Sequence, residues 1–317
     1  MKRQNKRKSF NSEMCFMGFN AAGLSSKFTS FNELLKTVKP TVFFAQETKL
    51  RTKGKISTEY SKEYQIYELN RKNKLGGGLA IGALHGVGHV QISEGDDDVE
   101  ILVTQLEVKG VPIRCICAYA PQEYDKIEKK ENFWPRLSFE VEQSDLNNCC
   151  TVIQMDGNLW GGPNLVKNDP NPQNNNGKLF EDFLKKHPQL RIGNNLDVCN
   201  GSITRTRKTI NRSEKSILDF FIFCEKLEKF VTEVLIDEDK MYALTNYSKV
   251  KVDSDHNTMI ARFNLAVEIQ PTTTMREECF NFKNEEAQKI FFANTEDAPE
   301  LLKCFDNDEG EHEHIKK

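Results

Sequence analysis

The sequence predicts an α/β fold in which helices pack against the outer faces of β-sheet layers. Apolar segments short enough to form single strands outnumber the amphipathic segments with helical spacing. Both kinds of segment recur along the whole chain instead of separating into a helical half and a strand half. This mixture is typical of an α/β sandwich.

Length and charge divide the chain into a main domain and two unlike ends. The 317 residues are 38% apolar and 29% charged, enough for one large core domain, which we expect at residues 13–265. Residues 1–12 are predicted to be a flexible basic arm. Residues 266–317 carry 6 basic and 13 acidic side chains, which predicts an acidic connector or tail, and the rest of the chain carries 38 and 34. The mild positive charge of the main part is compatible with a polyanionic partner.

In the first half of the chain, the pattern predicts one helix among several strands. Ser30 and Glu33 have the spacing of a capping box, so a helix is expected over residues 31–39, until Pro40 ends it. Lys109-Gly110 predicts the turn of a hairpin. Strands are expected at residues 14–20, 41–45, 64–69, 78–84, 100–108 and 111–119.

In the second half, helices and strands alternate. A helix is expected over residues 126–141, with Pro135 breaking or bending it. A second, amphipathic helix is expected over residues 179–187, and the Asn- and Pro-rich segment before it, residues 164–177, is expected to be a surface loop. Further strands are expected at residues 151–155, 217–223 and 258–263.

Cysteine usage and hydropathy predict an intracellular protein of the nucleus or cytoplasm. The nine cysteines contain no Cys-x-x-Cys pair, and most lie inside apolar runs, which favours reduced thiols packed as small apolar groups. The basic start lacks the apolar stretch of a secretory signal. No apolar run approaches the roughly 20 residues of a membrane helix, so no membrane partner is expected.

Polar side chains follow or end several of the predicted strands. Carboxylates at strand ends can hold a hard divalent cation, while an imidazole and amide groups can bind a phosphate and the attacking water. Such a set favours a hydrolytic phosphodiesterase. Its members are Asn20, Glu47, Tyr119, Asp156, Asn158, Asp219, Asp255 and His256.

Asp156-Gly157-Asn158 is the sharpest local signal. Side chains two residues apart on an extended segment point the same way, so Asp156 and Asn158 are expected to reach one site. The alternative is an ordinary Asp-Gly turn. Glu47 at a strand end is a candidate magnesium ligand, and its alternative is a solvated loop carboxylate.

Asp219 and His256 are a candidate pair. Asp219 lies on an otherwise apolar strand, and a buried carboxylate is unfavourable without a partner. An imidazole would be such a partner, because the acid would fix its tautomer and raise its pKa. The alternative is that Asp219 caps a backbone group.

Two basic segments are candidates for contact with nucleic-acid phosphates. Lys49 and Arg51 follow Glu47, and Arg205, Arg207 and Lys208 form a basic loop before Asp219. Such side chains could bind phosphates without reading sequence, or could be ordinary solvated loops.

The run Gly76-Gly77-Gly78 is a different kind of segment. No Lys-Ser or Lys-Thr follows it, so it is interpreted as the entry to a strand and not as a nucleotide site.

Taken in order, six motifs resemble those of the endonuclease/exonuclease/phosphatase superfamily, which includes DNase I and abasic-site nucleases. They span residues from about 14 to 264. Within the superfamily, the chain looks most like the endonuclease domains of non-LTR retrotransposons. The motifs are Phe19-Asn20-Ala21-Ala22-Gly23-Leu24, Gln46-Glu47-Thr48-Lys49, Tyr119-Ala120-Pro121, Asp156-Gly157-Asn158, Ser216-Ile217-Leu218-Asp219 and Ser254-Asp255-His256.

The resemblance implies a four-layer, DNase I-like α/β sandwich of two facing mixed sheets with outer helices. It also implies that Mg²⁺, with Mn²⁺ as a substitute, is bound by Glu47 and Asp255. The catalytic roles would fall to Asn20, Tyr119, Asp156, Asn158, Asp219 and His256. Many relatives carry Asp or Asn where this chain has Ala22, so reduced or altered activity is expected.

The function implied is a magnesium-dependent endonuclease that nicks DNA and leaves a 3′-hydroxyl, which would prime reverse transcription. The partners would be DNA and a reverse transcriptase domain in the same natural polypeptide. Two alternatives stay open. The same fold could act on a phospholipid or inositol phosphate, or the chain could be a catalytically weakened nucleic-acid-binding module.

Overall fold

The computed structural model describes residues 10–51, 56, 63–72, 76–96, 98–108, 110–208, 212–245 and 254–269. The chain divides into two units, residues 1–271 and 272–317, and every described residue belongs to the first. Of the expected basic arm (residues 1–12) and the expected acidic tail (residues 266–317), residues 1–9 and 270–317 lie outside the described residues.

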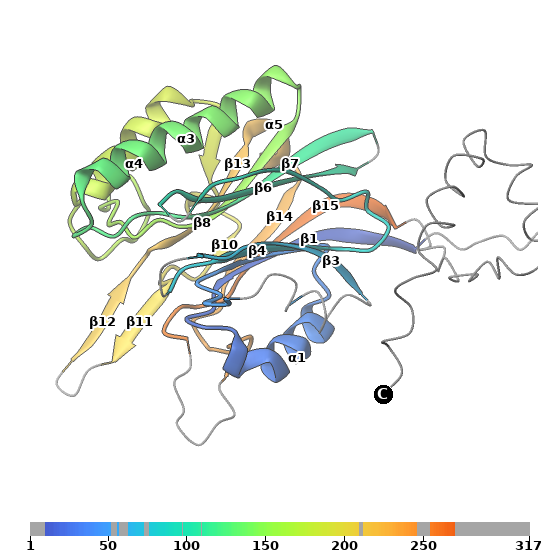
Figure 1. Cartoon of the computed structure of the whole chain (residues 1–317), viewed down its shortest axis with the longest axis horizontal. Helices are drawn as coiled ribbons and strands as arrows, with labels where there is room; N and C mark the ends of the chain where they lie inside the picture. The colour runs from blue at the N-terminus through green and yellow to red at the C-terminus, as the bar shows by residue number, and fades with distance from the viewer. Residues whose placement is uncertain are drawn as a thin grey trace, which may run out of the picture. The chain divides into compact units, whose positions relative to one another are not determined.

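Two mixed β-sheets form the centre of the fold (Figure 1). In the described part of the chain, the first sheet has seven strands and the second has six. The order of the first is β10 (Cys199–Asn200), β14 (Val231–Ile236), β15 (Met259–Ile269), β1 (Phe10–Asn20), β2 (Val42–Gln46), β4 (Leu79–Leu84) and β3 (Tyr64–Leu69). The order of the second is β5 (Val90–Glu94), β6 (Glu100–Val108), β7 (Val111–Tyr119), β8 (Cys150–Asp156), β13 (Asp219–Cys224) and β9 (Leu190–Ile192).

Helices cover the outer faces of both sheets. In Figure 1, α1 (Phe28–Val38) lies under the first sheet, and α3 (Ile127–Leu146) and α4 (Asn175–Lys186) lie over the second. The shorter helical segments are η1 (Ser25–Lys27), η2 (Gly193–Asn195) and α5 (Glu225–Glu228). The predicted four-layer α/β sandwich is therefore confirmed. Among the described residues, no helix has the length and apolar content that a membrane crossing needs.

Alternation along β1 builds two separate cores. Phe16 points between the sheets, where its ring centroid lies 5.3 Å from that of Phe263. Met17, the next residue, belongs to the cluster between the first sheet and α1. There Phe31 of α1 packs at 5.2 Å between ring centroids against Phe43 of β2. Because successive strand residues face opposite sides, one strand serves both layers.

Helix α3 excludes a break at Pro135, one of the two outcomes expected there. The helix runs through Pro135 to Leu146 and is not broken. Proline removes one helical hydrogen bond, but the face on either side of it is buried against the second sheet. Phe133, Trp134 and Leu137 are all at most 7% exposed. Tertiary packing therefore outweighs the local penalty.

The segment around Arg205 is also a correction. It was expected to be a loop, but it forms a two-stranded hairpin of β11 (Arg205–Lys208) and β12 (Ser213–Ser216). In Figure 1, this hairpin projects from the body of the domain. Its strands are rich in charge and lack an apolar alternation, so the sequence pattern did not indicate them.

The last core strand is longer than expected. Strand β15 continues to Ile269, and its end pairs with the start of β1, where Phe10 lies opposite Ile269. The sheet thus extends three residues before residue 13 and four after residue 265, the expected bounds of the domain.

Strand register brings the predicted polar residues to one end of the sandwich, where several central strands end or begin. Strands β1 and β2 are parallel and end together at Asn20 and Gln46. Strands β7 and β8 are also parallel, with Tyr119 opposite Asp156. Asp219, the first residue of the antiparallel β13, lies opposite Asp156 as well. Polar groups from both sheets are therefore neighbours at this end of the sandwich.

Candidate active site

Asn20 links the two sheets at the centre of the candidate site. Its Nδ2 group donates hydrogen bonds to Asp156 Oδ2 at 2.8 Å and to Glu47 Oε1 at 3.3 Å. Its Oδ1 atom accepts a hydrogen bond from the Ala22 backbone N–H at 2.9 Å. Asn20 is 1% exposed. The amide therefore fixes two carboxylates relative to each other and orients the loop after β1.

Glu47 is held as an ionised carboxylate. The Tyr119 hydroxyl donates to Glu47 Oε1 at 2.8 Å, and Lys49 Nζ lies 2.7 Å from Oε2. Burial opposes ionisation, but Lys49, Tyr119 and Asn20 outweigh it and lower the pKa of Glu47. Glu47 also has a φ of 47°, a left-handed conformation uncommon for residues other than glycine. Backbone strain of this kind is often found at functional sites.

Asp156 ends β8, and the chain then turns sharply. Asp156 Oδ1 accepts the Asn158 backbone N–H at 3.0 Å, and Asn158 Nδ2 donates to the Ala120 carbonyl at 2.8 Å. Asn158 has a φ of 44°. The motif is thus a turn, as the alternative predicted, and the Asn158 side-chain amide is bonded to the backbone just after the end of strand β7. Burial, followed by the charge of Asp219, raises the pKa of Asp156 to about 7.

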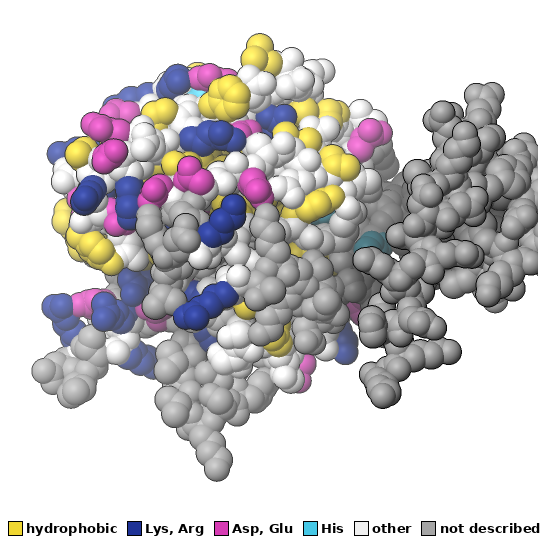
Figure 2. Space-filling view, viewed as in Figure 1, with side chains coloured by type: hydrophobic (Ala, Val, Ile, Leu, Met, Phe, Trp, Pro, Cys, Tyr) yellow, Lys and Arg dark blue, Asp and Glu magenta, His cyan; other side chains and the backbone are white. Residues whose placement is uncertain are grey.

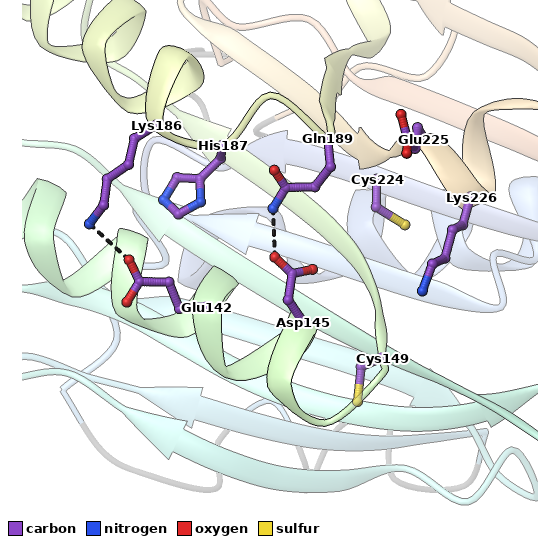
Figure 3. Close-up of a pocket in the computed structure, with 9 residues that line it drawn as sticks. All are labelled: Glu142, Asp145, Cys149, Lys186, His187, Gln189, Cys224, Glu225 and Lys226. Atoms are coloured by element: carbon purple, nitrogen blue, oxygen red, sulfur yellow. Dashed lines mark hydrogen bonds and ion pairs between the residues drawn. The ribbon is translucent and has the colours of Figure 1, made fainter.

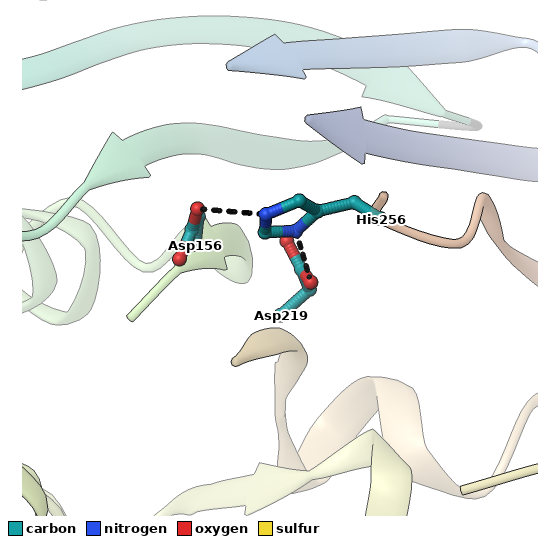
Figure 4. A group of neighbouring side chains, drawn as sticks. All are labelled: Asp156, Asp219 and His256. Carbon is teal, nitrogen blue, oxygen red and sulfur yellow. Dashed lines mark hydrogen bonds and ion pairs between the residues drawn. The ribbon is translucent and has the colours of Figure 1, made fainter. Parts of the chain in front are cut away.

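Asp219 and His256 form a buried hydrogen-bonded pair. His256 Nδ1 lies 2.8 Å from Asp219 Oδ2, and His256 Nε2 lies 4.0 Å from Asp156 Oδ2 (Figure 4). Burial disfavours the charged imidazole, but Asp219 and the neighbouring carboxylates outweigh it and raise the pKa of His256 to about 9. The imidazole is therefore a cation at neutral pH.

Asp255 lies beside this pair but interacts mainly with the basic hairpin. Its Oδ2 atom lies 2.7 Å from Arg205 Nε, and its Oδ1 atom lies 3.9 Å from His256 Nε2. Burial works against the charge of Asp255, but His256 and Arg205 prevail and lower its pKa. Asp255 therefore contacts Arg205 and His256, whereas Glu47 contacts Asn20, Tyr119 and Lys49.

A compact group of potential metal ligands lies within the site. One ligand atom each from Asp156, Asp219 and His256 lie within 4.8 Å of one another. His256 Nδ1 is hydrogen-bonded to Asp219, which leaves Nε2 as the ring atom that could bind a metal, and the imidazole would have to be neutral to do so. The carboxylates are a better match to a hard cation. Burial and then the charge of Asp219 raise the pKa of Asp156, and a bound cation would favour the ionised form of both carboxylates.

The basic side chains differ in their surroundings. Lys49 and Arg205 contact carboxylates of the site, whereas Arg51, Arg207 and Lys208 are exposed. Figure 2 shows Lys and Arg side chains gathered at the end of the molecule from which β11 and β12 project.

Two residues that hold the site residues in place through hydrogen bonds were not predicted from the sequence. Ser254 Oγ donates to the Asn20 carbonyl at 2.7 Å and accepts the His256 backbone N–H at 3.2 Å. Thr204 Oγ1 accepts the Asp219 backbone N–H at 3.0 Å. Ser254 lies within the motif that contains His256, which was a usable signal. Thr204 has no such signal.

Two pockets differ in their relation to this cluster. One of about 300 Å³ is lined by Glu47 and Tyr119, together with Arg71 and Tyr124. A larger one, of about 430 Å³, is lined by Asp145, Cys149, Lys186 and their neighbours (Figure 3). None of its lining residues belongs to the cluster, so the smaller pocket is the one relevant to the site.

Several solved structures share this fold. The endonuclease domain of TRAS1, a telomere-specific non-LTR retrotransposon, matches with a TM-score of 0.55 and 16% identity over 80% of this chain and 99% of that one. An AP endonuclease from Archaeoglobus fulgidus matches with a TM-score of 0.58 and 18% identity, over 80% and 100% of the two chains. TDP2 from D. rerio, complexed with a single-strand DNA product, matches with a TM-score of 0.54 and 12% identity, over the same shares.

No protein-family model and no curated protein sequence matches the chain. Its relationships are therefore visible in the arrangement of its strands and helices. By that arrangement, the chain has the fold of the endonuclease/exonuclease/phosphatase superfamily.

Proposed function

We propose that this protein is a divalent-metal-dependent phosphodiesterase that nicks DNA. One observation carries the proposal. Asn20 joins Glu47 to Asp156, and Asp156 faces the imidazole of the Asp219–His256 pair, all at one end of the sandwich. An ionised carboxylate, a candidate base and a cation next to each other suit hydrolysis of a phosphodiester.

The donor set fits a hard divalent cation. Glu47 and Asp255 both have lowered pKa values and are ionised at neutral pH, and oxygen ligands are those that Mg²⁺ and Mn²⁺ prefer. Glu47 and Asp255 are the proposed ligands, with Asp156 nearby. When bound, the cation would neutralise charge that develops on the phosphate oxygens.

His256 has the charge needed to bind a phosphate. Its imidazolium faces Asp156 through Nε2, while its Nδ1 is occupied by Asp219. We assign it the role of donating to a non-bridging phosphate oxygen as negative charge grows. Asp219 keeps the ring in one orientation and one protonation state.

Asp156 is the proposed general base. A pKa of about 7 suits a group that must accept a proton near neutral pH. The water oxygen attacks phosphorus, and the water proton passes to Asp156. The P–O3′ bond then breaks, and the leaving O3′ takes a proton from solvent, which yields a 3′-hydroxyl and a 5′-phosphate.

The remaining polar groups position the reactants. Asn158 orients the attacking water, and Asn20 keeps Asp156 and Glu47 in register. The Tyr119 phenol, whose pKa is raised by burial and by Asp156 and Glu47, remains a donor that contacts the scissile phosphate. The exposed Arg207 and Lys208 would bind flanking phosphates.

Retrotransposition is the biological setting that we propose. The fold match to the TRAS1 endonuclease domain supports it. In that setting, the 3′-hydroxyl would prime reverse transcription by a domain of the same natural polypeptide.

A plasmid-nicking assay tests the proposal. Supercoiled DNA should relax with Mg²⁺ and stay intact with EDTA. Asp156→Asn should lower the rate by at least about a hundredfold, because it removes the base. Asp169→Asn is the matched control, since Asp169 is also buried, at 5% exposure against 1% for Asp156, but caps the backbone of Gly162 and Asn171. Equal rates for Asp156→Asn and the wild type would contradict the proposed mechanism.

Two other outcomes would redirect the assignment. Tight DNA binding without nicking would favour a binding module. That alternative has support in Ala22, which supplies no carboxylate, and in Lys49, which neutralises Glu47. Hydrolysis of a phospholipid or inositol phosphate with the plasmid untouched would replace DNA as the substrate.

A further inference from the structure

Three consecutive glycines lie beside the loop that carries Glu47. Gly76, Gly77 and Gly78 precede β4 and have φ values of 84°, 61° and 91°. All three are in the left-handed region, which other residues rarely adopt. Three such residues in a row form a turn that the sequence could specify only with glycine.

This glycine turn binds the Glu47 loop through the backbone. The Thr48 N–H donates to the Gly78 carbonyl at 3.1 Å, and the Lys49 N–H donates to the Gly77 carbonyl at 2.8 Å. A Cβ atom on Gly78 would lie 2.5 Å from Thr48 Oγ1. The turn and the loop are therefore in close contact, with no room for a side chain between them.

A buried carboxylate holds the other side of the turn. Glu100, which is 3% exposed, accepts the Gly78 N–H on Oε1 at 2.5 Å and an Arg71 guanidinium N–H on Oε2. A Cβ atom on Gly77 would lie 2.3 Å from both Arg71 Nε and Glu100 Oε1. The ion pair therefore supports the turn directly.

Glu100 also lies next to Tyr119, a second residue that holds Glu47. Glu100 lies directly opposite Tyr119 in the β6–β7 pair, and the Tyr119 hydroxyl donates to Glu47 Oε1 at 2.8 Å. Burial raises the pKa of Glu100, and Arg71 opposes that rise. Arg71 thus supplies the positive charge that pairs with the buried Glu100 carboxylate next to the site.

We propose that Arg71 and Glu100 are positioning residues that hold the Glu47 carboxylate ready for a divalent cation through the glycine turn. The inference rests on the proposed metal-binding role of Glu47. It assigns a function to the three glycines and to an ion pair that the proposed chemistry does not use.

Mn²⁺ binding to the full chain, measured by calorimetry, tests the inference without relying on activity. Glu100→Ala and Arg71→Met should weaken Mn²⁺ binding by about ten- to hundredfold, as loss of groups behind metal ligands commonly does. Arg71→Lys keeps the charge and should recover part of the affinity. Glu47→Gln gives the reference for loss of the ligand itself.

Two matched controls separate positioning from general destabilisation. Arg114→Met breaks another buried ion pair, in which Arg114 Nη1 lies 3.7 Å from Glu140 Oε2, toward the opposite end of β7 from Tyr119. Gly78→Ala is compared with Gly110→Ala. Gly110 also has a positive φ, of 77°, but a Cβ there would meet nothing within 4 Å. Arg114→Met and Gly110→Ala should keep wild-type Mn²⁺ affinity, and Gly78→Ala should lose it.

The outcomes distinguish this inference from the proposed function. If Glu47→Gln weakens Mn²⁺ binding while Glu100→Ala, Arg71→Met and Gly78→Ala bind as the wild type does, the positioning role is wrong and the metal role of Glu47 stands. If Glu47→Gln itself binds Mn²⁺ normally, the proposed metal-binding role of Glu47 is wrong. Should Glu100→Ala not fold, Glu100→Gln and Gly78→Ala give the same comparison, with thermal midpoints as the check.

Discussion

His256 is the residue whose charge matters most to the proposed chemistry. Its ring is buried between Asp219 and Asp156, and its pKa of about 9 keeps it positive at neutral pH. We expect His256→Ala to lower the nicking rate by at least about a hundredfold, because a fixed cation at the developing charge is lost. Nicking rate and thermal midpoint should be measured together. A normal rate in a folded variant would remove His256 from the mechanism.

The same pair predicts a pH dependence of stability in metal-free protein. His256 titrates near 9 in the folded state, against about 6.5 when unfolded. A raised pKa means that its stabilising contribution is complete below pH 6.5 and is lost as pH rises through 9. The difference in thermal midpoint between wild type and His256→Asn should therefore shrink across that window. A difference that is constant from pH 6 to 10 would contradict the charged state.

Ala22 offers a test by addition. Its backbone N–H already bonds to Asn20 Oδ1, and its φ of 46° is one that aspartate tolerates. A carboxylate introduced by Ala22→Asp should strengthen Mn²⁺ binding by roughly tenfold, because it adds an oxygen ligand next to Asn20. Ala22→Ser is the control for side-chain size. Unchanged Mn²⁺ affinity in Ala22→Asp would mean that this position lies outside the cation site.

Among the strands and helices, the β11–β12 hairpin is the part most suited to holding DNA. Arg207 and Lys208 are exposed on it, while Arg205 ties its base to Asp255. Replacing Arg207 and Lys208 by alanine should weaken DNA binding and reduce the slope of log K against log salt by about 1 to 2, with Mn²⁺ affinity unchanged. Alanine at Lys36 and Lys226, two exposed lysines elsewhere, is the charge-matched control. An unaltered salt slope in the hairpin variant would exclude the contact.

The end of the folded domain can be tested by truncation. Residues Ala266–Ile269 pair with Phe10–Glu13 at the end of the first sheet. A chain that ends at residue 269 should keep its thermal midpoint within about 2 °C. A chain that ends at residue 265 should melt several degrees lower, since it loses that pairing. Equal midpoints for the two truncations would show that the last four residues add nothing to stability.

Much of the fold was predictable from local pattern. Strands such as Tyr64–Leu69 and Glu100–Val108 have the expected bounds because burial of their apolar residues and the flanking turns agree. The strand-end side chains were predictable for the same reason, since a polar residue that closes a buried strand is visible in the sequence. The β11–β12 hairpin and the unbroken α3 were not, because both depend on contacts with distant segments.

Local pattern is enough to identify the polar groups at or next to the ends of the buried strands, and hence the chemical composition of the candidate site. The partners of these groups come from long-range contacts: Asn20 bridges Glu47 and Asp156, Asp255 pairs with Arg205, and Glu100 with Arg71 supports the glycine turn. Composition and spacing act within a few residues of chain, so they leave these partners open. Charge states and orientations are set by neighbours that strand pairing and sheet packing bring together from far along it.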